Sequence, residues 1–222
     1  MNRYIVKVLH TEYLTHNVKR FVVEKPANYT FVSGQATEVS INTPELKNEL
    51  RPFTFTSLAG DDYLEFIIKI YTGHGGITEK MALIKADDEL IVHDVFGSIA
   101  YQGAGIFIAA GAGITPFISI FRDLKGNNNL AGNTLLFANR TAGDVILESE
   151  LEALLGANFI NVIQMPFSAN DSEKFITQKL LAEHLTSASQ FFYICGPDKF
   201  NNAVTGYLKN LGISETQIVL EQ

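Results

Sequence analysis

The chain has 222 residues, of which 46% are hydrophobic and 18% charged, and its mean hydropathy is +0.10. This composition is typical of a folded globular protein and excludes a disordered chain. The formal net charge is −7 and no basic cluster is present, which excludes a nucleic-acid footprint and argues against binding to an anionic membrane surface.

The number of cysteines and the hydropathy pattern limit the cellular compartments that we expect for this protein. Cys195 is the only cysteine, which excludes an internal disulfide and an iron–sulfur cluster held by four cysteines of this chain. No apolar run approaches the roughly 20 residues of a membrane span, and the N-terminus has no signal-peptide pattern. We therefore expect a cytoplasmic protein without a membrane anchor, and we expect no metal site.

The first 100 residues are predicted to form an antiparallel β-barrel. Short β-branched or aromatic runs are separated by Gly, Asp, Asn or Pro turns, which is typical of consecutive antiparallel strands. The strands are expected at residues 3–10, 18–23, 37–41, 53–57, 64–70 and 89–95. One short helix is expected at residues 78–85, with Thr78 as its N-cap.

From about residue 101 the pattern changes to continuous apolar strands that alternate with amphipathic helices, which is typical of a parallel sheet covered on both faces. The strands are expected at residues 106–110, 134–138, 159–164, 191–195 and 217–220, and the helices begin at Pro116, Glu148, Thr177 and Asp198. Gly126, Gly156 and Gly212 are expected as left-handed residues that end helices. We predict a doubly wound α/β domain with a five-stranded sheet at residues 101–222, after a barrel domain at residues 1–100.

One glycine segment lies between a predicted buried strand and a helix. It reads Gly111-Ala112-Gly113-Ile114-Thr115-Pro116. The glycines let backbone amides approach a diphosphate, Thr115 can cap the helix and Pro116 suits its first turn, so the helix N-terminus faces an anion. A glycine pair alone is equally compatible with a tight turn, but the position of this one in a doubly wound sheet favours a dinucleotide.

Two more predicted strands end in candidate binding residues at the same edge of the sheet. Asn139, Arg140 and Thr141 follow the second strand, and Cys195, Gly196 and Pro197 follow the fourth. Doubly wound sheets bind ligands at this edge. Taken alone, Arg140 is compatible with an ordinary exposed arginine and Cys195 with a small buried hydrophobic residue.

Two segments of the barrel half could hold a phosphate. Arg51 is the first residue of the segment Arg51-Pro52-Phe53-Thr54. Its guanidinium could bind a diphosphate, and the threonine hydroxyl could form a hydrogen bond with a polar ring edge. The alternative is an exposed arginine before an ordinary strand. The glycine loop at residues 73–78 could cradle a second phosphate, or it could only permit a turn.

These four segments, in this order, resemble the signatures of the ferredoxin–NADP reductase superfamily of flavoproteins, and the resemblance covers essentially the whole chain. They are residues 51–54, Gly75-Gly76-Ile77-Thr78, residues 111–116 and Cys195-Gly196-Pro197. The resemblance implies an N-terminal barrel that binds FAD and a C-terminal domain that binds NADH or NADPH.

The resemblance also implies roles for single residues. Arg51 would hold the flavin phosphate, and Thr54 would offer its hydroxyl to flavin N5. The rest of the flavin site would be formed by Pro52, Phe53, Ile67, Ile68, Lys69, Gly75, Gly76, Ile77 and Thr78. Cys195 would lie beside the nicotinamide C4 and Glu221 beside the flavin, so that Thr54, Cys195 and Glu221 are the expected catalytic residues. The dinucleotide is expected on Gly111, Gly113, Thr115, Pro116, Asn139, Arg140, Thr141, Cys195, Gly196 and Pro197.

The sequence departs from the family pattern in two places. Phe53 stands where the family usually has a tyrosine, and flavin reductases of the same superfamily, which use flavin as a loosely held substrate, share that feature. Residues 165–171 lack the arginine with which NADP-specific members bind the 2′-phosphate. We therefore expect NADH to be used at least as well as NADPH.

The expected function is that of an FAD-dependent NAD(P)H oxidoreductase. It would pass a hydride from the nicotinamide to the flavin and then single electrons to a carrier such as flavodoxin or ferredoxin. Three alternatives remain: an NAD(P)H:flavin reductase that uses free flavin, an electron-transfer subunit of a larger complex, and a ligand-sensing module without turnover.

Overall fold

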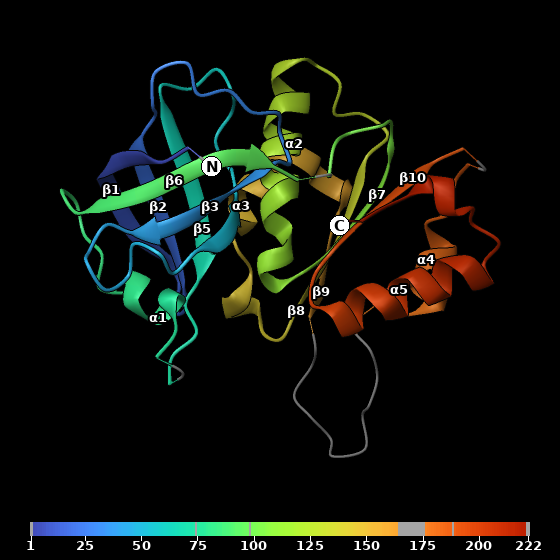
Figure 1. The fold of residues 1–222 in the computed structure, drawn as a ribbon. Coiled ribbons are helices and arrows are strands. Elements are labelled where there is room, and N and C mark those ends of the chain that lie inside the picture. Colours follow the sequence, from blue (N-terminus) through green and yellow to red (C-terminus); the bar gives the residue numbers. More distant parts are fainter. Residues whose placement is uncertain (1, 74, 98, 164–175, 188, 221–222) are drawn as a thin grey trace.

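Two β-sheets, one antiparallel and one parallel, organise the chain in a computed structural model that describes residues 2–73, 75–97, 99–163, 176–187 and 189–220. Figure 1 shows the antiparallel sheet on one side, the parallel sheet on the other, and helix α2 (Thr115–Gly126) between them. None of the helices in these ranges is long and apolar enough to cross a membrane.

The antiparallel sheet has six strands in the order β4-β3-β6-β1-β2-β5. Their bounds are β1 (Tyr4–Thr15), β2 (Val18–Glu24), β3 (Ala36–Ile41), β4 (Arg51–Thr54), β5 (Tyr63–Lys69) and β6 (Glu89–Phe96). Just past β4, the Thr56 N–H donates to the Glu65 carbonyl of β5 at 2.9 Å, which closes the sheet into a barrel. Phe21, Phe55 and Phe66 fill its interior because aromatic rings bury a large apolar area.

The parallel sheet has five strands in the order β11-β10-β7-β8-β9. Their bounds are β7 (Gly105–Ala110), β8 (Thr134–Asn139), β9 (Phe159–Ile163), β10 (Phe191–Cys195) and β11 (Ile218–Leu220). The strand order reverses between β7 and β10, so the loops that follow these two strands border the crevice in which doubly wound sheets bind ligands. The segments after Ala110 and after Cys195 therefore meet at one place.

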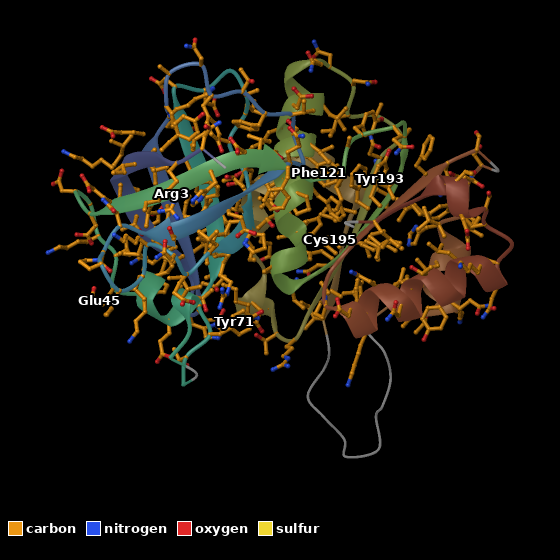
Figure 2. The ribbon with its side chains drawn as sticks, in the orientation of Figure 1. Arg3, Glu45, Tyr71, Phe121, Tyr193 and Cys195 are labelled. Carbon is orange, nitrogen blue, oxygen red and sulfur yellow. The ribbon has the colours of Figure 1, made fainter. Side chains whose placement is uncertain are left out.

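Helices cover both faces of the parallel sheet. They are α2, α3 (Glu148–Leu155), α4 (Gln178–Glu183) and α5 (Asp198–Asn210). Helices α2 and α3 share an apolar cluster on the face toward the barrel, and α4 and α5 share the cluster on the far face. Val18 and Ile67 of the barrel belong to the same cluster as Phe117 and Phe121 of α2, so an apolar contact joins the barrel to the parallel-sheet half. Figure 2 places Phe121 in the middle of the molecule.

The predicted fold class is confirmed, with local differences. Strand β4 begins at Arg51 instead of residue 53, because Arg51 and Pro52 pair with Val39 and Glu38 of β3. Pro52 lacks an N–H, and it is accommodated because β4 lies at the edge of the hydrogen-bonded sheet. Strand β1 continues past residue 10 to Thr15 and forms a hairpin with β2.

Two predictions about helix ends were wrong. Helix α1 spans only Ile77–Met81, and its N-cap is Gly76, so Thr78 lies inside the helix and does not cap it. Gly126 is the last residue of α2, and the left-handed residue after that helix is Asn128, with φ of 53°. Gly156 and Gly212 do have positive φ, as expected.

Candidate functional site

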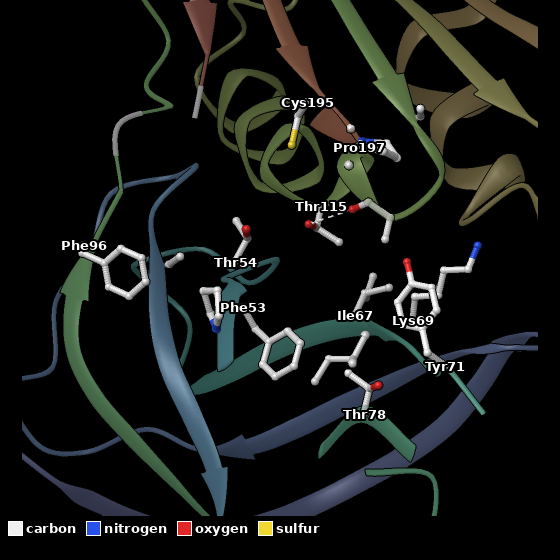
Figure 3. A pocket seen from close by; sticks show the side chains of 17 residues that line it. Phe53, Thr54, Ile67, Lys69, Tyr71, Thr78, Phe96, Thr115, Cys195 and Pro197 are labelled. Atoms are coloured by element: carbon white, nitrogen blue, oxygen red, sulfur yellow. Dashed lines mark hydrogen bonds between the residues drawn. The ribbon is translucent and has the colours of Figure 1, made fainter. Parts of the chain in front are cut away.

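A cavity of about 560 Å³ lies between the barrel and the parallel sheet (Figure 3). It gathers most of the predicted site residues: Pro52, Phe53, Thr54, Ile67, Ile68, Lys69, Thr78, Gly113, Thr115, Cys195, Gly196 and Pro197. Its lining also includes residues outside the predicted binding set: Ala36, Tyr71, Phe96, Ala110 and Ala112. Segments far apart in the chain thus line one cavity.

The barrel wall of the cavity is apolar with a polar margin. Thr54 ends β4, where it pairs with Ala36 of β3. Ile67 and Lys69 are alternate residues of β5, so both face the same side of the strand, and Tyr71 continues this alternation beyond the strand end. The Lys69 Nζ lies 5.8 Å from the centre of the Tyr71 ring, within reach of a cation–π contact. A flat apolar ring system with polar edges would fit this wall.

The opposite wall comes from the loops after β7 and β10. Cys195 ends β10 and is buried, and in Figure 3 it lies across the cavity from Thr54. The segment Gly111–Ile114 forms a 3₁₀ turn, with Gly111 at φ of 53° and open space around its α-carbon. A backbone of this shape can approach a large ligand closely because no side chain intervenes.

The expected cap at Thr115 was wrong. Ile114 is the N-cap of α2, and Thr115 is the first residue of the helix. Its hydroxyl donates to the Ala112 carbonyl at 3.1 Å, drawn as a dashed line in Figure 3. The physical reason is that the preceding 3₁₀ turn already has helical backbone angles, so the chain enters the helix before Thr115. Pro116 is buried in the first turn of the helix, outside the cavity lining.

Two backbone amides of the glycine loop before α1 donate hydrogen bonds to a carboxylate of the same chain. The Glu79 carboxylate accepts hydrogen bonds from the Gly75 N–H at 2.7 Å and the Gly73 N–H at 3.2 Å. These amides are therefore directed at a negative charge. Thr78 lines the cavity, but Gly75, Gly76 and Ile77 do not, and Ile77 is buried in the barrel core.

Arg51 lies outside the cavity lining. Its side chain is exposed, and Nη1 donates to the Leu50 carbonyl at 2.6 Å. The neighbouring Pro52 does line the cavity. The Arg51 guanidinium is therefore exposed next in sequence to a residue of the cavity lining.

A buried lysine that the sequence did not indicate holds α1 in place. The Lys19 Nζ on β2 donates to the carbonyls of Ala82 at 2.9 Å and Ile84 at 2.6 Å, just after the helix. A cation satisfies carbonyls that have no partner within the helix. Burial lowers the pKa of Lys19, with Asp88 acting in the opposite direction. The visible signal was a lysine at a buried position of a strand.

Asn139 at the end of β8 and the two residues after it lie at the expected sheet edge but outside the cavity lining. Asn139 is 4% exposed, and within the described residues its amide oxygen and nitrogen have no hydrogen-bond partner. Arg140 is exposed. The Thr141 N–H and hydroxyl both donate to Asp144 Oδ2, at 3.0 and 2.7 Å. Burial acts to raise the pKa of Asp144, but the hydrogen bonds from Thr141 outweigh it and lower that pKa.

Two sequence predictions fall on residues that the structure does not describe. They are Glu221 and the loop at residues 165–171. Within the described ranges, no group of three or more His, Cys, Asp or Glu side chains could hold a metal ion.

Comparison with known proteins gives one consistent result. A family model for an FAD-binding domain matches residues 3–93, and a model for an oxidoreductase NAD-binding domain matches residues 107–206. The chain is 26% identical over 226 residues to NADH–cytochrome b5 reductase 1 of Arabidopsis thaliana, covering 94% of this chain and 80% of that protein. It is 28% identical over 236 residues to human NADH-cytochrome b5 reductase 1, covering 88% and 77% respectively.

Among solved structures, the fold is similar to that of a ferredoxin NADP⁺ reductase from Neisseria gonorrhoeae with bound FAD and NADP. The TM-score is 0.84 at 18% identity, and the match covers 99% of this chain and 98% of that one. The two family models follow each other in the order of the two sheets. The chain therefore consists of an FAD-binding domain followed by an oxidoreductase NAD-binding domain, and its fold is that of a ferredoxin NADP⁺ reductase.

Proposed function

We propose that this protein oxidises NADH with its FAD and delivers the electrons one at a time to a small haem protein of the cytochrome b5 type. The observation that carries the proposal is the shared cavity, in which Thr54 of the barrel and Cys195 of the parallel sheet occupy opposite walls (Figure 3). Hydride transfer requires two rings to be held in contact and aligned, and a cavity between two cofactor-binding domains supports that arrangement.

We assign FAD to residues 1–100. The residues fit the group because the amides of Gly73 and Gly75 are directed at an anion, the Glu79 carboxylate, whose place a flavin phosphate would take. Arg51 supplies an exposed positive charge beside the same cavity, and Thr54 offers a hydroxyl to the ring edge. Bound FAD supplies the chemistry that accepts a hydride and releases single electrons. Ile67 and Phe53 keep water from the ring face.

We assign NADH to residues 101–222. The loop after β7 presents Gly111 and Gly113 beside the start of α2, and anions bind favourably at such helix starts. Cys195 leaves room for a ring because its side chain is small, and its burial excludes water from the reacting position. NADH is preferred to NADPH in this proposal because residues 165–171 contain no arginine or lysine for a 2′-phosphate.

The relatives favour a different electron acceptor from the one expected from the sequence. From the sequence we expected flavodoxin or ferredoxin, but the two curated relatives described above are named as cytochrome b5 reductases. Cations of the barrel half offer an attractive surface to an acidic carrier: Lys69 lines the cavity, and Arg51, Lys80 and Lys85 are exposed. Association should therefore be steered by local charge despite the net charge of −7. A reducing, cytoplasmic setting is part of the proposal and is supported by the single cysteine.

The test is stopped-flow reduction of the FAD-loaded protein by NADH under anaerobic conditions, followed by mixing with cytochrome b5, flavodoxin, ferredoxin or free FMN. We expect rapid reoxidation by cytochrome b5, with a rate that falls as salt screens the attraction. Lys80→Glu should slow this step, and Lys209→Glu on α5 is the matched control that should not. Negligible reoxidation by every protein carrier would contradict the proposal.

A flavin reductase is the second candidate, and Phe53 is the observation in its favour. The residue lines the cavity without the hydroxyl that the family usually places there. In that case the purified protein would be colourless, and free FMN would be turned over efficiently while cytochrome b5 would not. Yellow protein that retains FAD through gel filtration would exclude this candidate.

A further inference from the structure

Arg122 on α2 connects the two halves of the molecule through three acceptors. Its Nη1 donates to the Glu65 carboxylate at 2.7 Å and to the Thr56 carbonyl at 2.7 Å, both in the barrel half. Its Nε and Nη2 donate to the two carboxylate oxygens of Glu150 on α3, at 2.6 and 2.9 Å. One guanidinium therefore binds Glu150 within its own half and Glu65 across the boundary.

The barrel end of the connection is sheltered from water. Glu65 is 4% exposed, and it also accepts a hydrogen bond from the Thr56 hydroxyl at 2.8 Å. Burial acts to lower the pKa of Arg122, but the two carboxylates outweigh it and raise that pKa, so the guanidinium remains charged. If Arg122 moved away, the Glu65 carboxylate would keep only the Thr56 hydroxyl and Arg20, whose Nη1 lies 3.9 Å away, in a position with little access to water, so separation is costly. The contact therefore resists sliding of one half over the other.

The residues of this contact sit on the elements that carry the cavity walls. Arg122 follows Thr115 on α2 by about two helical turns, and Thr115 lines the cavity. Glu65 and Ile67 are alternate residues of β5, and Ile67 lines the cavity from the other side. A helix and a strand are rigid over such short lengths, so a shift at the ion pair moves one cavity wall relative to the other.

We propose that the Arg122–Glu65 ion pair fixes the distance and angle between the two cofactor-binding walls, which makes Arg122 and Glu65 positioning residues for hydride transfer. The identity of the two rings rests on the proposed function. Glu150 orients the guanidinium but does not reach the barrel, so it does not fix the relative placement of the walls.

Glu65→Leu and Glu150→Leu form a matched pair of variants, since each removes one carboxylate from the same guanidinium. In Glu65→Leu we expect flavin reduction by NADH to slow by about 10- to 100-fold, because a small misplacement of reacting groups is costly. The long-wavelength charge-transfer absorbance of stacked flavin and nicotinamide should also weaken. Glu150→Leu should keep both values near those of the wild type, and Glu65→Gln should recover part of the rate because its amide oxygen still accepts from Arg122.

A second readout needs no cofactor. Calorimetry of the flavin-free protein should show one unfolding transition for the wild type and for Glu150→Leu, and a broadened or split transition for Glu65→Leu. This measurement tests the connection even if the chain uses other cofactors. A folded Glu65→Leu protein with one transition and a wild-type charge-transfer band would overturn the proposal.

If Glu65→Leu does not fold, Arg122→Lys takes its place. It keeps the positive charge but cannot bind both carboxylates and the Thr56 carbonyl in one fork. A wild-type reduction rate and band in Arg122→Lys would equally overturn the proposal.

Discussion

Gly113 lies directly against the backbone of Cys195, and a β-carbon on Gly113 would be 2.2 Å from the Cys195 carbonyl oxygen. Gly111, two residues earlier in the same turn, has open space around it but a φ of 53°. The two glycines are therefore needed for different reasons, since Gly113 permits close packing of two loops and Gly111 permits a left-handed backbone.

These reasons predict different outcomes for two similar substitutions. Gly113→Ala should destabilise the protein by about 1–3 kcal/mol or more and displace the loop that carries Cys195. Gly111→Ala should cost about 1–2 kcal/mol through backbone strain alone. Urea unfolding measures the first effect, and the rate of flavin reduction by NADH measures the displacement. Equal stability and equal rates in the two variants would contradict this reading of the turn.

Arg51→Ala should weaken FAD retention. The lost charge-assisted hydrogen bonds are each worth about 1.5–3 kcal/mol. The dissociation constant for FAD, measured by titration of the flavin-free protein, should therefore rise by at least about tenfold. Arg3→Ala is the control, because Arg3 is also an exposed barrel arginine and donates to Asn48 at 3.0 Å. An equal effect of the two substitutions would mean that general charge, and not contact with FAD, is responsible.

Cys195→Ala should leave FAD binding intact and slow flavin reduction. The thiol lies on the wall opposite the barrel and does not belong to the flavin-phosphate segments. An interaction made mainly in the transition state lowers the rate without a matching change in dinucleotide affinity. Stopped-flow reduction across NADH concentrations separates the two quantities. An unchanged limiting rate would assign Cys195 a packing role only.

NADH should have a higher kcat/KM than NADPH. A preference for the 2′-phosphate needs a positioned cation, and Arg140 is an exposed arginine at the edge of the parallel sheet. Arg140→Ala should therefore change the NADH value little. A strong NADPH preference that disappears in Arg140→Ala would show that this arginine does bind the phosphate.

Asp144 should make stability depend on pH in the acidic range. Its pKa in the folded protein lies below the ordinary value of 3.8, so the unfolded chain binds more protons as the pH falls through this range. The stabilisation is complete above the ordinary value and is lost as the pH falls through the lowered one. The stability difference between wild type and Asp144→Asn should shrink in this window, as measured by urea unfolding at several pH values. Thr141→Val should reduce the same difference by removing one hydrogen bond.

The sequence predicted the elements and most of the cavity because both depend on local patterns. Alternation in β5 and the glycine turn after β7 are visible without a structure. Tyr71 was missed although it continues the alternation of Ile67 and Lys69. The cap at Thr115 was wrong because the turn before α2 already has helical geometry, and the cap at Thr78 was wrong because α1 begins one residue earlier, directly after the extended Gly76.

The roles of Lys19 and Arg122 could not be predicted from sequence. Lys19 reaches carbonyls near residue 84, and Arg122 reaches Glu65 in the other half of the chain. These contacts join segments that are distant in sequence, and each residue taken alone is an ordinary surface-type side chain. The buried strand position of Lys19 was the one local signal, and no local pattern identifies the distant partners of either residue.

The position of β10 between β7 and β11 has a consequence for biosynthesis. The barrel strands are complete once Phe96 has been made, whereas β7 lacks one neighbour until β10 ends at Cys195. A nascent chain leaves the ribosome from its N-terminus, and its domains generally fold as units in that order. The wall that carries Thr54 can therefore form while the wall that carries Cys195 is still being synthesised.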